Sequence, residues 1–120
     1  MVNEVVISGV TVSSDVINTI VIDATEGVEG VAYVEGTKLS YNLISMIRQD
    51  APVAPAKGVE IETEGEKLKL RVHVAAFFGY PFTKLASGVR EAVADAMRLQ
   101  VGAEVSEIDV CIEELVFPKE

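Results

Sequence analysis

The sequence predicts an α+β fold, a two-layer sandwich in which two main helices cover one face of a mixed or antiparallel sheet. The segments 59–74 and 108–112 alternate apolar with polar side chains, as strands do when one sheet face is buried and the other meets water. The segments 16–26 and 82–99 repeat their apolar residues at the spacing of an amphipathic helix. Strands and helices that are each apolar on one side bury those sides against each other, which gives two layers.

With 120 residues, the chain has the length of one compact domain. Hydrophobic residues make up 49% of it and charged residues 24%, so it has enough apolar side chain for a core. We therefore expect a single domain over residues 1–120. The predicted order is strand, helix, strand, short helix, strand, strand, helix, strand.

A strand and a helix are predicted near the N-terminus. The segment from Val5 to Val12 is rich in β-branched residues, and Gly9 within it indicates a bend or bulge in one strand. Ser13 or Ser14 offers a side-chain oxygen to cap a helix that continues to about residue 26. The next strand is predicted over 31–34. The helix that ends at about residue 26 has an apolar stripe, which consists of Val16, Ile17, Ile20, Val21 and Ala24.

A short helix and an extended connection are predicted next. Ser40 is a candidate cap for a helix of two turns at most. Pro52 and Pro55 stop a helix from continuing and favour an extended connection over 51–56, inside the domain.

Residues 59–74 predict a β-hairpin whose two-residue turn is Gly65-Glu66. Glycine in the first position of such a turn is typical of type II′. The predicted facing pairs are Glu64 with Lys67, Glu62 with Lys69, Glu60 with Arg71, Ile61 with Leu70 and Val59 with Val72. A slip by one residue would put charges on the apolar face, so we expect this register to be well specified.

A long helix and a last strand complete the prediction. Pro81 suits the first turn of a helix that continues to about Leu99, with Gly102 as its stop. Its predicted apolar face consists of Phe82, Leu85, Ala86, Val89, Val93, Ala96 and Met97. In the last strand, Leu115 and Phe117 have the opposite parity from Ile108, Val110 and Ile112. A bulge near Glu113-Glu114 is expected to return them to the core face.

Charge and composition exclude several classes of partner. Ten Lys and Arg against nineteen Asp and Glu give a net charge of -9, which disfavours nucleic acid and acidic membrane surfaces. The single cysteine, Cys111, cannot form an internal disulfide, and Met1 to Glu4 do not begin a signal peptide. The longest apolar stretch, 74–82, is too short to span a membrane. We therefore expect a cytoplasmic protein without direct membrane insertion.

The residue types that carry chemistry do not form a recognisable motif. A metal site needs three or four ligands, whereas the one histidine, His73, and Cys111 are predicted on different strands, so no metal is expected. His73 continues a basic strip and is predicted to be an exposed strand residue. Acidic neighbours disfavour a reactive thiolate at Cys111. Neither a Gly-x-Ser-x-Gly turn nor a glycine-rich phosphate loop is present, so no cofactor is expected.

These exclusions favour a binding protein over an enzyme, although a Ser–His–acid triad, whose members meet only in the fold, stays open. Two partner surfaces are candidates. The last strand is predicted at a sheet edge, where Asp109, Cys111 and Glu113 face outward and form a candidate partner-binding edge. The alternative is an apolar pocket near Phe77, Phe78 and Tyr80, which would indicate a small-molecule or lipid-metabolism regulator, or a weak enzyme.

Three stretches together resemble the alkaline shock protein family, best known from Gram-positive bacteria. They are Gly9 to Val16 leading to Gly30-Val31, then Lys57 to Ile61, and finally Phe78-Gly79-Tyr80-Pro81 through the last helix to Phe117. Two positions depart from the family pattern: Asp109 stands for asparagine and Phe78 for tyrosine.

The resemblance implies a non-enzymatic cytoplasmic protein linked to cell-envelope stress or homeostasis, without catalytic or cofactor-binding residues. In some members a separate membrane-anchored partner holds the protein at the membrane. We therefore expect a scaffold or adaptor that self-associates into a homo-oligomer or docks to a membrane-anchored protein.

Overall fold

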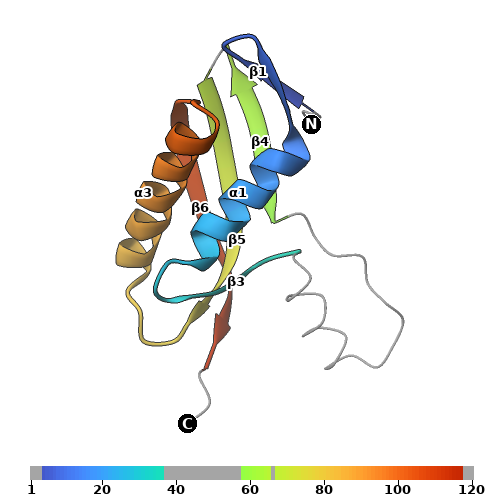
Figure 1. The fold of residues 1–120 in the computed structure, drawn as a ribbon. Helices are drawn as coiled ribbons and strands as arrows, with labels where there is room; N and C mark the ends of the chain where they lie inside the picture. The colour runs from blue at the N-terminus through green and yellow to red at the C-terminus, as the bar shows by residue number, and fades with distance from the viewer. Residues whose placement is uncertain (1–3, 37–57, 66, 118–120) are drawn as a thin grey trace, which may run out of the picture.

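A four-stranded mixed sheet, covered on one face by two helices, organises the residues that the computed structural model describes, 4–36, 58–65 and 67–117 (Figure 1). The sheet consists of β3 (Val31–Val34), β4 (Val59–Glu64), β5 (Lys67–Phe77) and β6 (Val105–Val116), and the helices are α1 (Ser14–Glu26) and α3 (Phe82–Gln100). A second sheet pairs only β1 (Glu4–Ile7) with β2 (Val10–Ser13). The predicted two-layer α+β sandwich is confirmed.

Strand β5 is the centre of the larger sheet because it pairs along both edges. One edge pairs in parallel with β6. The other pairs antiparallel with β4 as far as Val72 and with β3 from Val74, so β3 and β4 lie end to end beside the same strand. At their junction the His73 N–H donates to the Gly58 carbonyl (2.7 Å), and the His73 carbonyl accepts from the Glu35 N–H (2.8 Å).

The hairpin of β4 and β5 has the predicted register. Glu60 lies opposite Arg71, Ile61 opposite Leu70, and the other predicted pairs match as well. Gly65 has a φ of +64°, which a two-residue turn of this kind needs in its first position. The alternation of charged and apolar residues therefore specified this pairing correctly.

The two helices begin and end close to their predicted bounds and bury narrow stripes against the sheet. Ser13 caps α1, since its Oγ accepts the Val16 N–H (3.3 Å), and Gly102 follows α3 with a φ of +75°. The buried residues are Ile17, Val21 and Thr25 on α1, and Leu85, Val89, Val93 and Met97 on α3. Val16 and Phe82 were predicted on the apolar faces but lie at their margins, each 49% exposed.

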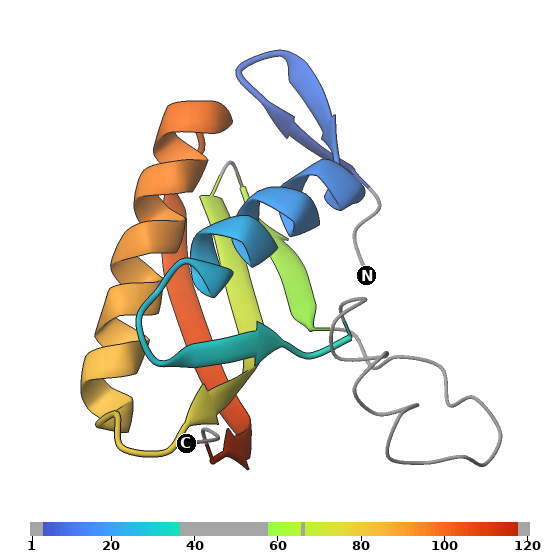
Figure 2. The ribbon, with the colours of Figure 1, turned by 60° about the horizontal axis from the view of Figure 1, so that its bottom comes forward.

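The prediction of a single strand from Val5 to Val12 is wrong. Ser8 (φ +49°) and Gly9 (φ +80°) instead form a two-residue turn, and Ile7 pairs with Val10 across it. Positive φ at both central residues is the signature of a type I′ turn, whose twist suits a hairpin. Figure 2 shows this hairpin projecting beyond the sheet at the start of α1.

The short helix predicted near Ser40 and the connection over 51–56 lie outside the described residues. The predicted bulge in β6 is confirmed: Val74 pairs with Ile112 but Ala75 pairs with Glu114, so Glu113 is the extra residue. Leu115 and Phe117 are nevertheless 43% and 67% exposed, not buried as predicted. A bulge restores the parity of a strand, but burial also requires a covering element, and here no described element covers these two side chains.

Substitutions on the two faces of β5 test the assignment of its core. Leu70 is 2% exposed on the helix-covered face, whereas Lys69 lies on the open face. Leu70→Ala should lower the free energy of unfolding by about 2–5 kcal/mol. Lys69→Ala loses exposed ion pairs and should cost no more than about 1 kcal/mol. Equal losses in chemical denaturation would contradict the assignment.

Gly58 tests the junction of β3 and β4. A Cβ at this position would lie 1.8 Å from the Glu35 carbonyl oxygen, so the backbone of one strand must move. Gly58→Ala should therefore cost about 1–3 kcal/mol or more, as overpacking does. Gly27→Ala is the control, because its Cβ would meet nothing closer than 3.6 Å. If both variants melt at the same temperature, the close approach is absent.

Candidate functional site

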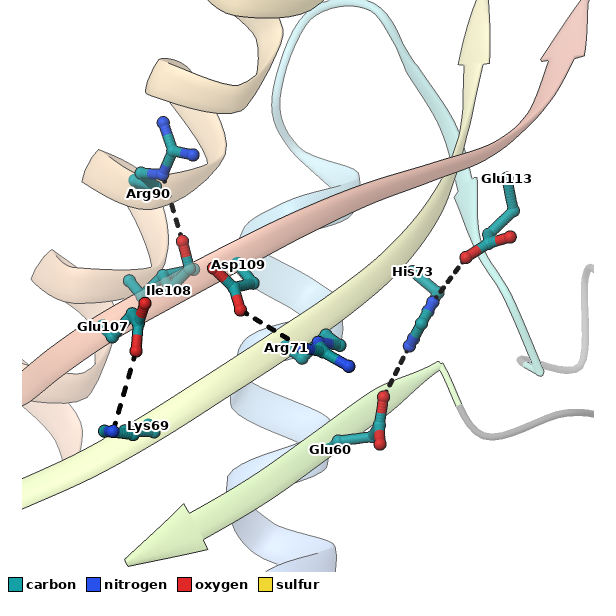
Figure 3. Close-up of polar contacts among 9 residues, drawn as sticks. All are labelled: Glu60, Lys69, Arg71, His73, Arg90, Glu107, Ile108, Asp109 and Glu113. Atoms are coloured by element: carbon teal, nitrogen blue, oxygen red, sulfur yellow. Dashed lines mark hydrogen bonds and ion pairs between the residues drawn. The ribbon is translucent and has the colours of Figure 1, made fainter. Parts of the chain in front are cut away.

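The sheet face opposite the helices carries a ladder of charges across three strands (Figure 3). Alternate residues of a strand point to one face, so the register sets the rows of the ladder. The basic residues of β5 lie in the middle, between acidic residues of β4 and β6. The members are Lys69, Arg71 and His73 on β5, Glu60, Glu62 and Glu64 on β4, and Glu107, Asp109 and Glu113 on β6.

Two rows of this ladder are exposed ion pairs. The Lys69 Nζ lies 3.3 Å from Glu64 Oε2 and 3.9 Å from Glu107 Oε2, and the Arg71 guanidinium lies 3.5 Å from Asp109 Oδ2. A hydrogen bond to Glu64 and the charges of Glu64 and Glu107 raise the pKa of Lys69. Water screens such pairs, so each contributes little to stability. Their effect is to offset part of the negative charge that the carboxylates of β4 and β6 place on this face.

The third row is built on His73, whose ring is held from both sides. Its Nε2 lies 2.7 Å from Glu60 Oε2 and its Nδ1 lies 2.8 Å from Glu113 Oε1. Ionised carboxylates only accept hydrogen bonds, so both contacts are hydrogen bonds when the ring carries two protons. Partial burial lowers the pKa of His73, but the hydrogen bonds and charges of the two carboxylates outweigh it and raise the pKa overall. His73 is therefore not the exposed strand residue that was predicted.

Cys111 completes this row because it is the register partner of His73 in the parallel pairing of β5 and β6. The ligand atoms of His73, Cys111 and Glu113 all lie within 4.8 Å of one another. His73 and Cys111 were correctly predicted on different strands, but it was not foreseen that these strands are neighbours. Part of this arrangement could have been predicted, because a helix between two strands, such as α3 between β5 and β6, favours a parallel crossover. The register of that pairing, however, is not visible in the sequence.

The predicted partner-binding edge is only partly as expected. In the described part of the chain β6 is an outer strand, and Arg90 Nε of α3 donates to its Ile108 carbonyl (3.0 Å) (Figure 3). Asp109, Cys111 and Glu113 do lie on the face away from the helices. Asp109 and Glu113, however, contact Arg71 and His73 instead of pointing freely to water. A partner-binding role for the three residues stays a prediction.

A buried tyrosine on β3 forms a hydrogen bond with a residue of β6, on the other side of β5. Tyr33 of β3 is 5% exposed, and its hydroxyl donates to the Glu114 carboxylate of β6, directly after the bulge. Burial and the negative charge of Glu114 raise the pKa of Tyr33. Tyr33 and Glu114 are both register partners of Ala75, so this hydrogen bond connects β3 and β6 across β5.

Aromatic side chains gather where β5 and β6 end. The ring of Phe78 stacks on that of Phe117 at a centroid distance of 5.0 Å, and the Phe78 N–H donates to the Val116 carbonyl. Tyr80 packs against Gly30, where a Cβ would lie 2.9 Å from its ring. Phe77 is half-buried, whereas Phe78 and Tyr80 are exposed.

Two pockets of the described residues lie away from these aromatics. One is on the charged face, beside Lys69 and Arg71, and the other lies between α1 and α3, beside Ile20 and Leu99. Phe77, Phe78 and Tyr80 line neither of them. No helix among the described residues is long and apolar enough to cross a membrane.

The contacts of His73 with Glu60 and Glu113 predict how its ring titrates when no ion is bound to it. Since its pKa is raised above the ordinary 6.5, its two hydrogen bonds stabilise the fold fully below about pH 6.5. That contribution is lost as the pH rises through the raised value. An NMR titration of this ring should show the raised pKa in the wild type and a lower one in Glu113→Gln. Glu62→Gln, on the same face, is the control, and an identical pKa in Glu113→Gln and wild type would refute the contacts.

Comparison with known proteins identifies the family of the chain. Solved structures of the MamM CTD share the fold: one described as MamM-CTD 215-293 has a TM-score of 0.55 at 13% identity and covers 84% of this chain and 98% of its own. A nickel form of a MamM CTD variant has a TM-score of 0.54 at 14% identity, covering 83% and 96%. A search of curated proteins found no match. The model of the Asp23 family, where Asp23 names the family and not a residue, matches residues 3–117. The chain therefore belongs to the Asp23 family, described as having a cell envelope-related function, which confirms the resemblance to alkaline shock proteins.

Proposed function

We propose that the chain is a non-enzymatic, cytoplasmic adaptor of the cell envelope that docks a membrane-anchored protein. The observation that carries this proposal is the exposed aromatic end, which we define as Phe78, Tyr80, Leu115 and Phe117. Phe78 directly follows β5 and Tyr80 comes two residues later; Leu115 lies near the end of β6 and Phe117 directly follows it. Because these two strands run in parallel, their ends coincide, and the four side chains gather at one end of the sheet.

Exposed apolar side chains that gather in this way favour a protein interaction. Phe78 is 57% exposed although it stacks on Phe117, so the two rings present a preformed apolar surface. Aromatic side chains dominate the energetics of many interfaces, because they bury a large area at a small cost in side-chain entropy. The net charge of -9 favours a partner segment that carries basic residues beside its apolar ones.

The charged face supports the non-enzymatic part of the proposal. Lys69, Arg71 and His73 each contact carboxylates of neighbouring strands. Strand pairing and solubility are sufficient to explain these ion pairs, so no catalytic role is needed to account for the charged residues. The family description, a cell envelope-related function, supports the setting in which the adaptor would act.

A membrane-recruitment experiment tests the proposal. We expect the wild type to be recovered with the membrane fraction of its source cells and to crosslink to an integral membrane protein there. Phe78→Ser combined with Phe117→Ser should weaken this association by about tenfold or more, as the loss of central interface aromatics does. Leu99→Ser is the control, since Leu99 is an 81% exposed apolar residue of α3 outside the aromatic end.

Sedimentation of the purified chain distinguishes self-association into a homo-oligomer from docking to a membrane-anchored protein. A homo-oligomer that dissociates in the double variant would show that the aromatic end joins copies of the chain. Wild-type protein that stays monomeric and absent from membranes would contradict the adaptor function. So would a double variant that binds as well as the wild type.

A further inference from the structure

Three side chains with different metal-binding atoms converge on the open face, where β5 and β6 run in parallel. Cys111 lies directly beside His73 in the register, and Glu113 follows Cys111 by two residues on the same face. Their ligand atoms lie within 4.8 Å of one another. Both strands are held by backbone hydrogen bonds on either side of this row, so the three side chains are brought together before any ion binds.

We propose that His73, Cys111 and Glu113 bind a divalent transition-metal ion, and that Zn²⁺ is the ion that fits best. Thiolate, imidazole and carboxylate are the three types of side chain that coordinate zinc in proteins. Ligand atoms of a tetrahedral zinc site are about 3.3–3.6 Å apart, given bonds of about 2.0–2.3 Å. The three ligand atoms, which lie within 4.8 Å of one another, would have to move closer together to reach this spacing. The sulfur and nitrogen ligands select against Mg²⁺ and Ca²⁺, which prefer oxygen.

Glu60 gives the His73 ring the orientation that a metal ligand requires. Histidines that bind a metal through one nitrogen commonly donate the other N–H to a carboxylate, which fixes the tautomer. Here the His73 Nε2 lies 2.7 Å from Glu60 Oε2, and Nδ1 is the nitrogen that faces Glu113. An ion at Nδ1 would take the place of the proton between this nitrogen and the Glu113 carboxylate. Glu60 is therefore a positioning residue for this site.

Binding of the ion requires the loss of two protons and leaves the neighbouring charges offset. When the ion binds, the His73 Nδ1 and the Cys111 thiol each release a proton to water, and the Glu113 carboxylate needs to release none. The neighbouring cation, Arg71, is offset by the Asp109 carboxylate 3.5 Å away. Three protein ligands leave a fourth position for water or for a donor from a partner. A bound ion would join β5 to β6, so it should also stabilise the fold.

A cobalt titration tests the site directly. Metal-free, reduced protein is titrated with Co²⁺, whose bond to a thiolate gives a near-ultraviolet charge-transfer absorption. We expect one ion per chain, displacement of Co²⁺ by Zn²⁺, and a melting temperature that rises with Zn²⁺ concentration. Cys111→Ser should remove the charge-transfer band, and His73→Gln should weaken binding by at least tenfold. Glu60→Gln should weaken it by about 10–100-fold, as the loss of an orienting carboxylate does.

Asp109→Asn is the matched control, because Asp109 is a carboxylate of the same strand and face that contacts Arg71 and not His73. It should bind Co²⁺ as the wild type does. Circular dichroism checks that Cys111→Ser, which changes a single atom, keeps the fold. A wild type without one-to-one binding would overturn the proposal. A folded Cys111→Ser variant with unchanged affinity would overturn it equally.

Discussion

Strand β5 pairs along both of its edges, and this pairing sets the position of every other strand of the larger sheet. With β6 on one side and β4 followed by β3 on the other, β5 has hydrogen-bonded neighbours from Lys67 to Phe77. Its alternate residues therefore have fixed sides: Leu70 and Val72 face the helices, and Arg71 and His73 face away from them. The close approach at Gly58 follows from the same constraint, because β3 and β4 must meet beside one strand.

The parallel pairing of β5 and β6 also produces both candidate functional surfaces. It brings Cys111 beside His73, although 38 positions separate them in the sequence, and it ends the two strands together so that Phe78 can stack on Phe117. The metal-site and docking proposals are nonetheless independent of each other. One rests on polar ligand atoms in the middle of the open face, and the other on apolar rings at the end of the sheet.

The sequence predicted what depends on local patterns. Glu60 and Arg71 were paired correctly because charges alternate with apolar residues in both strands and only one register keeps them on one face. The bulge at Glu113 was predicted from the change of parity before Leu115. The hairpin at Ser8-Gly9 was missed: a Ser-Gly pair is a turn signal, but positive φ at a serine is rare, so Gly9 was interpreted as a bend within one strand. The row of His73 and Cys111 was missed because it depends on a long-range register.

Both proposals depend on the parallel pairing of β6 with β5, in the register that puts Cys111 opposite His73. Cross-strand NOE contacts between backbone amide and Hα protons of the isotope-labelled protein test it most directly. We expect the parallel contact pattern, with Arg71 beside Asp109 and His73 beside Cys111. An antiparallel pattern would contradict it. So would a shift by one residue, because it would place Ile112 beside His73 and turn Cys111 and Glu113 to the opposite face of the sheet.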